Sequence, residues 1–191
     1  MEDLPKDRYY HVDVPQDVVN PAFRSWANKL GYVVAGVEVF CFPKDFQMEI
    51  HVDGIEFTDK HKINWTYSEH DHEMSWYVPN ETWQNRQTVY EQDDGNIDDY
   101  SYAFEKDEVD KIASTKVKGN ATGYCTVVNS GYPHGIETIG GSRISFSATL
   151  YPTNVTPPNK DWGVSILTAQ KHYKDYIVEG SEVWYEDSLH N

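Results

Sequence analysis

The chain has 191 residues, of which 39% are hydrophobic and 25% charged, a composition typical of a folded globular protein. Its 31 acidic and 16 basic residues give a formal net charge of −15, which repels phosphate backbones and excludes nucleic-acid binding as an expected function. No run of about 18 apolar residues occurs, so no transmembrane segment is expected. This length suits one hydrophobic core, and we predict a single β-rich domain over residues 1–191.

The N-terminus and the cysteines bear on where the protein works. No apolar stretch follows a basic start, so an intact secretory signal is not predicted. The location stays open: cytoplasmic if Met1 is the native start, secreted if a signal was removed. The two cysteines, Cys41 and Cys125, lie in apolar segments, and buried reduced thiols are favoured over a long-range disulfide.

The first predicted element is a short amphipathic helix between Asn20 and Gly31. Asn20 suits the N-cap, and Pro21 suits the first helical position, where its missing N–H is not needed. Helical spacing places four apolar residues on one face, namely Phe23, Trp26, Ala27 and Leu30. We therefore expect this helix to pack on a larger body.

Residues 32–57 predict strands of that body. Tyr32 to Phe42 is an almost unbroken apolar run, which indicates a strand covered on both faces. Alternating apolar residues from Phe46 to Val52 precede Asp53-Gly54, a pair typical of a two-residue hairpin turn. In that hairpin His51 pairs with Glu56, and we expect this polar pair on the exposed face.

The middle of the chain predicts two strands separated by a loop. Apolar residues occupy odd positions at 63–67 and even positions at 74–76, and a straight strand cannot bury both sets. Residues 69–73 are therefore expected to form the connecting loop or bulge. Farther on, Val109, Ile112 and Ala113 hint at one short helix.

The C-terminal half predicts further strands at 124–128, 144–150, 164–168, 173–178 and 182–185. In the clearest of them, apolar Ile144, Phe146, Ala148 and Leu150 alternate with polar residues, which is typical of a half-buried strand. The predicted fold class is mostly β: an antiparallel β-sandwich, or alternatively a closed β-barrel, with a short N-terminal helix.

The densest group of potential metal ligands lies at residues 68–73. His70 and His72 share a face if the chain is extended, and Glu69, Glu73 or distant His134 could complete a transition-metal site. The alternative interpretation is a polar loop, which the change of parity predicts independently. A divalent metal ion is the one cofactor that the sequence suggests.

A second metal hypothesis concerns the acidic region from Glu91 to Asp110, which contains nine acidic residues and one basic residue. Oxygen ligands from Asp93, Asp94 and Asp98 suit a hard cation such as calcium, although the spacing is not that of an EF-hand. A solvated acidic loop is the favoured alternative, and a phosphate-mimicking surface for a basic partner is another.

Aromatic residues in polar stretches suit stacking on a sugar or another flat polar ligand. The residues that satisfy this condition are Trp83, Tyr100, Tyr102, Tyr132 and Trp162. Core packing is the alternative interpretation, and it is favoured for Trp65 and Trp184, which lie inside alternating strands.

The leading functional hypothesis is a non-enzymatic binding or interaction protein with an aromatic and acidic surface, and glycans are the first candidate ligand. Small molecules and proteins are the other expected partners, and homo-oligomerisation stays open. One alternative is a pocket enzyme that uses a metal or general acid–base residues inside the sandwich or barrel. Another is a structural assembly subunit of a virus or filament. No nucleophile-elbow or phosphate-binding glycine motif occurs.

Overall fold

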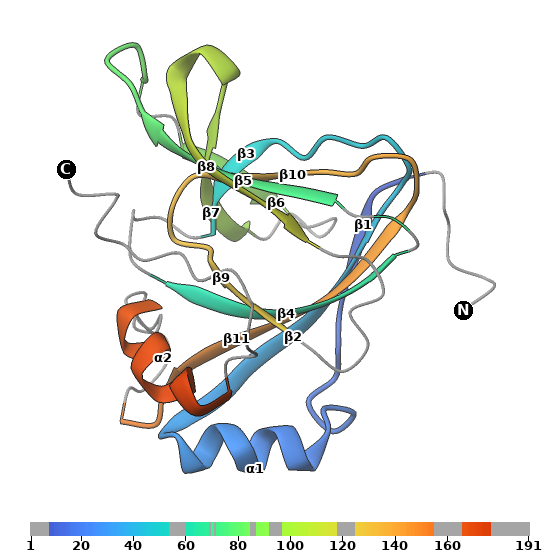
Figure 1. The fold of residues 1–191 in the computed structure, drawn as a ribbon, viewed down its shortest axis with the longest axis vertical. Helices are drawn as coiled ribbons and strands as arrows, with labels where there is room; N and C mark the ends of the chain where they lie inside the picture. The colour runs from blue at the N-terminus through green and yellow to red at the C-terminus, as the bar shows by residue number, and fades with distance from the viewer. Residues whose placement is uncertain are drawn as a thin grey trace.

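Two antiparallel sheets stack as a sandwich, and the helices lie outside them (Figure 1). The structure is a computed structural model that describes residues 8–53, 60–68, 70, 72–84, 87–91, 97–117, 125–154 and 166–176. Strands dominate these residues, so the predicted mostly β sandwich is confirmed.

The first sheet has five strands, with β11 at its centre between β2 and β4. Both pairings run almost the full length of β11, with one register shift against β2 at Thr149/Leu150. In spatial order the strands are β1 (Tyr10–Asp13), β2 (Tyr32–Phe42), β11 (Arg143–Pro152), β4 (His61–Ser68) and β9 (Thr126–Asn129).

The second sheet has six strands, and both edges of its short strand β3 are occupied. His51 on β3 pairs with Ala103 on one side and with His134 on the other. In spatial order the strands are β6 (Gln87–Glu91), β7 (Ile97–Phe104), β3 (Ile50–Val52), β10 (His134–Glu137), β5 (His72–Pro79) and β8 (Val109–Val117).

From β2 to β5 and again from β8 to β11, each strand lies in the opposite sheet from the strand before it, which is the connectivity of a jelly roll. Strands β2, β4, β9 and β11 belong to the first sheet, whereas β3, β5, β8 and β10 belong to the second. Every crossing brings distant parts of the sequence to the space between the sheets. Residues near positions 51, 62, 134 and 143 therefore share one interior.

Helix α1 (Pro21–Lys29) confirms the predicted N-terminal helix, because the Asn20 side chain accepts a hydrogen bond from the Ala22 N–H at 2.9 Å. It lies beneath the first sheet in Figure 1, as does α2 (Ile166–Tyr173). Both helices contribute buried alanines to a core with Leu150. No helix in the described ranges has the length and apolar character needed to cross a membrane.

Several predicted elements are wrong. Residues 109–117 form strand β8 rather than a helix, because pairing with β5 outweighs the weak helical spacing of this segment. The described parts of the strands predicted at 164–168 and 173–178 belong to α2 and to the 3₁₀ turn η2 (Lys174–Tyr176). A second 3₁₀ turn, η1 (Lys106–Glu108), precedes β8. The strand predicted at 182–185 lies outside the described residues.

The predicted exposed pair of His51 with Glu56 is also wrong, because β7 and β10 already occupy both edges of β3. The second strand of the predicted hairpin, residues 55–57, lies outside the described residues. Both cysteines are free thiols, as predicted, although only Cys41 is buried and Cys125 is exposed.

Candidate metal centre

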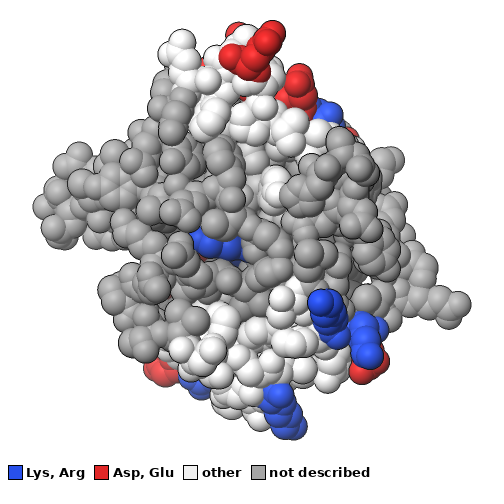
Figure 2. All heavy atoms as spheres, turned by 90° about the vertical axis from the view of Figure 1, so that its left-hand side faces the viewer, with Lys and Arg blue, Asp and Glu red and all other residues white. Residues whose placement is uncertain are grey.

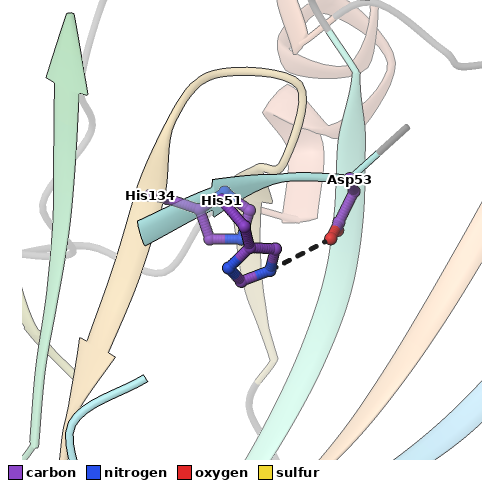
Figure 3. Close-up of side chains that lie close together, drawn as sticks. All are labelled: His51, Asp53 and His134. Atoms are coloured by element: carbon purple, nitrogen blue, oxygen red, sulfur yellow. Dashed lines mark ion pairs between the residues drawn. The ribbon is translucent and has the colours of Figure 1, made fainter. Parts of the chain in front are cut away.

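Three potential metal ligands meet where β3 ends beside the start of β10. One ligand atom from each of His51, Asp53 and His134 lies within 4.8 Å of the other two. Figure 3 shows the two imidazoles side by side, with His51 directed toward the Asp53 carboxylate. Because strand side chains alternate, His51 and Asp53 point into the space between the sheets. Their neighbours Ile50 and Val52 pack on the opposite face.

Backbone carbonyls fix the orientation of both imidazoles. The Nδ1–H of His51 donates to the Glu49 carbonyl, and that of His134 donates to the Tyr132 carbonyl, each at 2.9 Å. A carbonyl oxygen can only accept, so Nδ1 carries the proton in both rings. Each Nε2 is thereby left to face other partners, which is the arrangement that orients histidine ligands of metals.

The carboxylate of Asp53 uses its two oxygens differently. Oδ1 lies 3.4 Å from His51 Nε2, and Oδ2 lies 3.0 Å from the Nζ of Lys62, which comes from the first sheet. Burial raises the pKa of Asp53, but the charge of Lys62 and the hydrogen bond from His51 outweigh it and hold that pKa well below its usual value. Asp53 is therefore an anion, the form in which a carboxylate binds a metal ion.

The two histidines differ in their affinity for protons. Burial opposes protonation of His51, but its hydrogen bond with Asp53 outweighs burial and raises the pKa of His51. Burial, together with the neighbouring His51, lowers the pKa of His134 to about 4. His134 is thus neutral at physiological pH and has an unprotonated nitrogen to offer.

Arg143 contributes a buried cation to the same interior. The residue is 1% exposed, and its Nη2 donates to Thr66 Oγ1 at 3.3 Å and to Ser145 Oγ at 3.5 Å. Its Nε and Nη1 have no hydrogen-bond partner in the described structure. Burial lowers the pKa of Arg143 to about 10. A buried cation with unused donors is costly unless a ligand satisfies it.

One cavity of about 50 Å³ joins these two groups. Its polar lining includes His51, Asp53, Lys62, Asn64, His134 and Arg143. Figure 2 shows basic atoms recessed at the middle of one face of the molecule. The interior of the sandwich can therefore hold a cation on one side and an anion on the other.

The structure places His70 and His72 in different surroundings. His72 is buried, and its two ring nitrogens contact Ser68 Oγ at 2.5 Å and the Ile139 N–H at 3.4 Å. His70 is exposed and packs against Gly141. A metal site at this pair stays a prediction, and both ring nitrogens of His72 already have protein partners.

The other predicted site residues are described only in part. Asp93, Asp94 and Trp162 lie outside the described residues, as do the side chains of Asp98, Tyr100 and Tyr102. Trp83 packs against Phe104 with ring centroids 5.6 Å apart. Tyr132 supplies the carbonyl that orients His134. The aromatic recognition surface stays a prediction.

Sequence reasoning missed His51, Asp53 and Arg143, and it named His134 only as an optional third ligand. A usable signal was present, because His51 and Asp53 are two residues apart at a strand end and so share a face. Arg143 and Ser145 repeat that spacing in β11. In both strands the polar positions were interpreted as the exposed face.

No family model and no curated protein matches the chain. Peruvianin-I, a cysteine peptidase from Thevetia peruviana latex, is 10% identical with a TM-score of 0.37, and the match covers 76% of this chain and 63% of that one. An RmlC-like cupin from Desulfovibrio desulfuricans is 11% identical with a TM-score of 0.35, covering 78% and 90%. An oxalate oxidase is 12% identical with a TM-score of 0.36, covering 91% and 69%. The chain thus spans less than two thirds of peruvianin-I, and likenesses this distant carry no argument about function.

Proposed function

We propose that this protein is a non-haem iron oxygenase that uses a 2-oxo acid as co-substrate. His51, Asp53 and His134 would hold Fe(II), and Arg143 would bind a carboxylate of the co-substrate. The observation that carries the proposal is one interior cavity lined by a two-histidine, one-carboxylate set and by a buried guanidinium with unused donors. Such a ligand set with open positions is typical of non-haem Fe(II) oxygenases.

The residues present fit a transition ion. Ligand atoms about 2.1 Å from an ion lie about 3 to 4 Å apart, so the three atoms need only small side-chain rotations from their separations of up to 4.8 Å. Both imidazoles already have their Nδ1–H groups engaged, so Nε2 is the donor atom in each. The ionised Asp53 and the neutral His134 already have the protonation states that a divalent ion requires, whereas His51 would give up the Nε2 proton that it directs at Asp53.

The charges in and beside the cavity favour an anionic co-substrate. Asp53 and Glu38 carry two negative charges, and Lys62 and Arg143 carry two positive ones. A divalent ion therefore leaves the interior with two uncompensated positive charges. A 2-oxo dicarboxylate such as 2-oxoglutarate carries two negative charges, and one carboxylate could accept hydrogen bonds from the free Nε and Nη1 of Arg143.

Fe(II) when bound would supply the electrons that activate O2 for the coupled reaction. One oxygen atom of O2 enters the carboxylate formed as the 2-oxo acid loses CO2, and the other enters a C–H bond of a second substrate to give an alcohol. In this scheme Arg143 orients the 2-oxo acid, and the apolar part of the cavity wall, including Phe42 and Met74, limits access of water.

A direct test combines metal binding with turnover. The purified chain, stripped of metal, is titrated anaerobically with Fe(II) and, in parallel, with Co(II). We expect one ion per chain, and we expect Fe(II)-loaded protein to convert 2-oxoglutarate to succinate only when O2 is present. Slow succinate formation is expected even without the second substrate.

The same ligand types also occur in zinc hydrolases, so the test must separate the two. Stoichiometric zinc in the isolated protein, together with no O2-dependent consumption of 2-oxoglutarate, would contradict the oxygenase. If no divalent ion binds, the non-enzymatic binding hypothesis becomes the better one. In the described lining of the cavity, Asp53 is the one carboxylate, and hydrolysis would need a further general base.

A further inference from the structure

Lys62 connects the proposed metal ligand Asp53 to the opposite sheet. It lies on β4 in the first sheet, whereas Asp53 directly follows β3 in the second. Its Nζ lies 3.0 Å from Asp53 Oδ2 and 3.2 Å from Glu38 Oε2, and 5.9 Å from the centroid of the Phe40 ring. Both ion pairs are largely shielded from water, because the Lys62 side chain is 16% exposed.

These contacts give the two oxygens of the Asp53 carboxylate different partners. Oδ2 is held by Lys62, whereas Oδ1 faces His51 Nε2, one of the proposed metal-binding nitrogens. A carboxylate that is free to turn can bind an ion through both oxygens and so use two coordination positions. With Oδ2 engaged by an ammonium group, only Oδ1 remains for the ion.

We infer that Lys62 is a positioning residue that restricts Asp53 to one-oxygen ligation and so keeps a coordination position open for the 2-oxo acid and O2. This inference rests on the proposed function. Glu38 complements Lys62, because its charge balances the added cation and its carboxylate gives Nζ a second acceptor. The pair Lys62–Glu38 therefore orients Asp53 without changing the total charge of the interior.

The test separates positioning from charge. The double variant Lys62→Met with Glu38→Gln removes one positive and one negative charge together, so it keeps the formal charge of the interior. We expect this variant to bind Co(II) as tightly as the parent or more tightly, because the freed Oδ2 can add a ligand. We expect its turnover of 2-oxoglutarate to fall about 10- to 100-fold, the range usual for partners of metal ligands.

A spectroscopic readout reports the coordination itself. Visible absorption of the Co(II)-loaded protein depends on the number of ligands, and we expect it to change in the double variant. Lys62→Arg, which can still donate to Asp53 Oδ2, should restore most of the parent spectrum and turnover. Lys111→Met is the matched control, because Lys111 pairs with Glu73 on the exposed surface and should leave both readouts unchanged.

Each outcome is decisive. If the parent protein binds neither Fe(II) nor Co(II), the proposed function fails, and the inference fails with it. If the parent binds metal but the double variant matches it in affinity, spectrum and turnover, Lys62 does not position Asp53. If the double variant loses Co(II) affinity together with turnover, Lys62 only maintains the structure and the inference is overturned. A thermal melt of each variant confirms that the compared proteins are folded.

Discussion

Buried histidines serve two different purposes in the two interiors of this molecule. Under the helices, the buried His61 has its Nε2 3.1 Å from the Tyr173 hydroxyl, whereas the exposed His172 has its Nδ1 2.5 Å from the Tyr32 hydroxyl. Between the sheets, His51 and His134 give their Nδ1–H groups to backbone carbonyls and turn Nε2 toward the cavity. The contrast teaches that burial does not identify a functional histidine. What identifies a functional histidine is the partner of each of its ring nitrogens.

The largest expected effect separates a histidine proposed as a metal ligand from a buried histidine whose ring nitrogens both have protein partners. His134→Ala removes a nitrogen ligand, and we expect the affinity for Co(II) to fall at least about 100-fold. Removing a residue that only hydrogen-bonds a metal ligand usually lowers affinity by about 10- to 100-fold. His72→Ala, at an equally buried position, removes hydrogen bonds with Ser68 and Ile139 but no ligand of the site formed by His51, Asp53 and His134. It should lower the free energy of unfolding by about 2–3 kcal/mol and leave Co(II) affinity unchanged.

Calorimetric titration and urea denaturation of the two variants provide the measurements. A loss of Co(II) affinity in His72→Ala, with affinity retained in His134→Ala, would reverse the comparison and favour the site predicted from the sequence at His70 and His72.

The second prediction concerns the unused donors of Arg143. Arg143→Met removes a buried cation whose Nε and Nη1 have no hydrogen-bond partner in the described structure, so the free energy of unfolding should be unchanged or higher by about 1 kcal/mol. The same change should weaken 2-oxoglutarate binding to the metal-loaded protein at least about 30-fold, equivalent to about 2 kcal/mol. Titration calorimetry measures this affinity, and urea denaturation measures the stability.

Arg24→Met on α1 is the control, because Arg24 bonds the Gln16 carbonyl outside the cavity and should not affect 2-oxoglutarate binding. A large loss of stability in Arg143→Met would show that Arg143 is a structural residue rather than a ligand-binding one.

The sequence predicted the strands better than it predicted their faces. Alternation in β11 was correctly recognised, yet Ser145 and Ser147 are 2% and 3% exposed, whereas Phe146 is 42% exposed. The same inversion occurs in β4, where Thr66 is buried and Tyr67 is half exposed. Alternation shows that two faces differ, but it cannot show that the polar face lines an interior cavity. Only the pairing of the sheets decides that.

The candidate site was hidden for a related reason. Its residues come from separate segments of the sequence, and only the crossings of the strands between the sheets bring them together. The sequence predicted a metal site at His70 and His72 because they are two residues apart, whereas His134 is 83 positions from His51. The helix at Pro21–Lys29 could be predicted because its cap and spacing are local. Long-range pairing leaves no comparable local trace.

The smallest predicted effect tests whether the interior beneath the helices is independent of the cavity. Tyr32→Phe removes only the hydroxyl that contacts His172 on α2, and the ring can keep its packing against Tyr173. Loss of one hydrogen bond to an exposed histidine should lower the free energy of unfolding by about 1 kcal/mol or less. Tyr176→Phe is the matched control, because Tyr176 is 58% exposed and should change stability by less than about 0.5 kcal/mol.

Neither variant should alter Co(II) affinity, because neither hydroxyl belongs to the described lining of the cavity. If Tyr32→Phe weakens Co(II) binding, docking of α2 is coupled through β2 and β4 to the metal ligands, and the two interiors act as one unit.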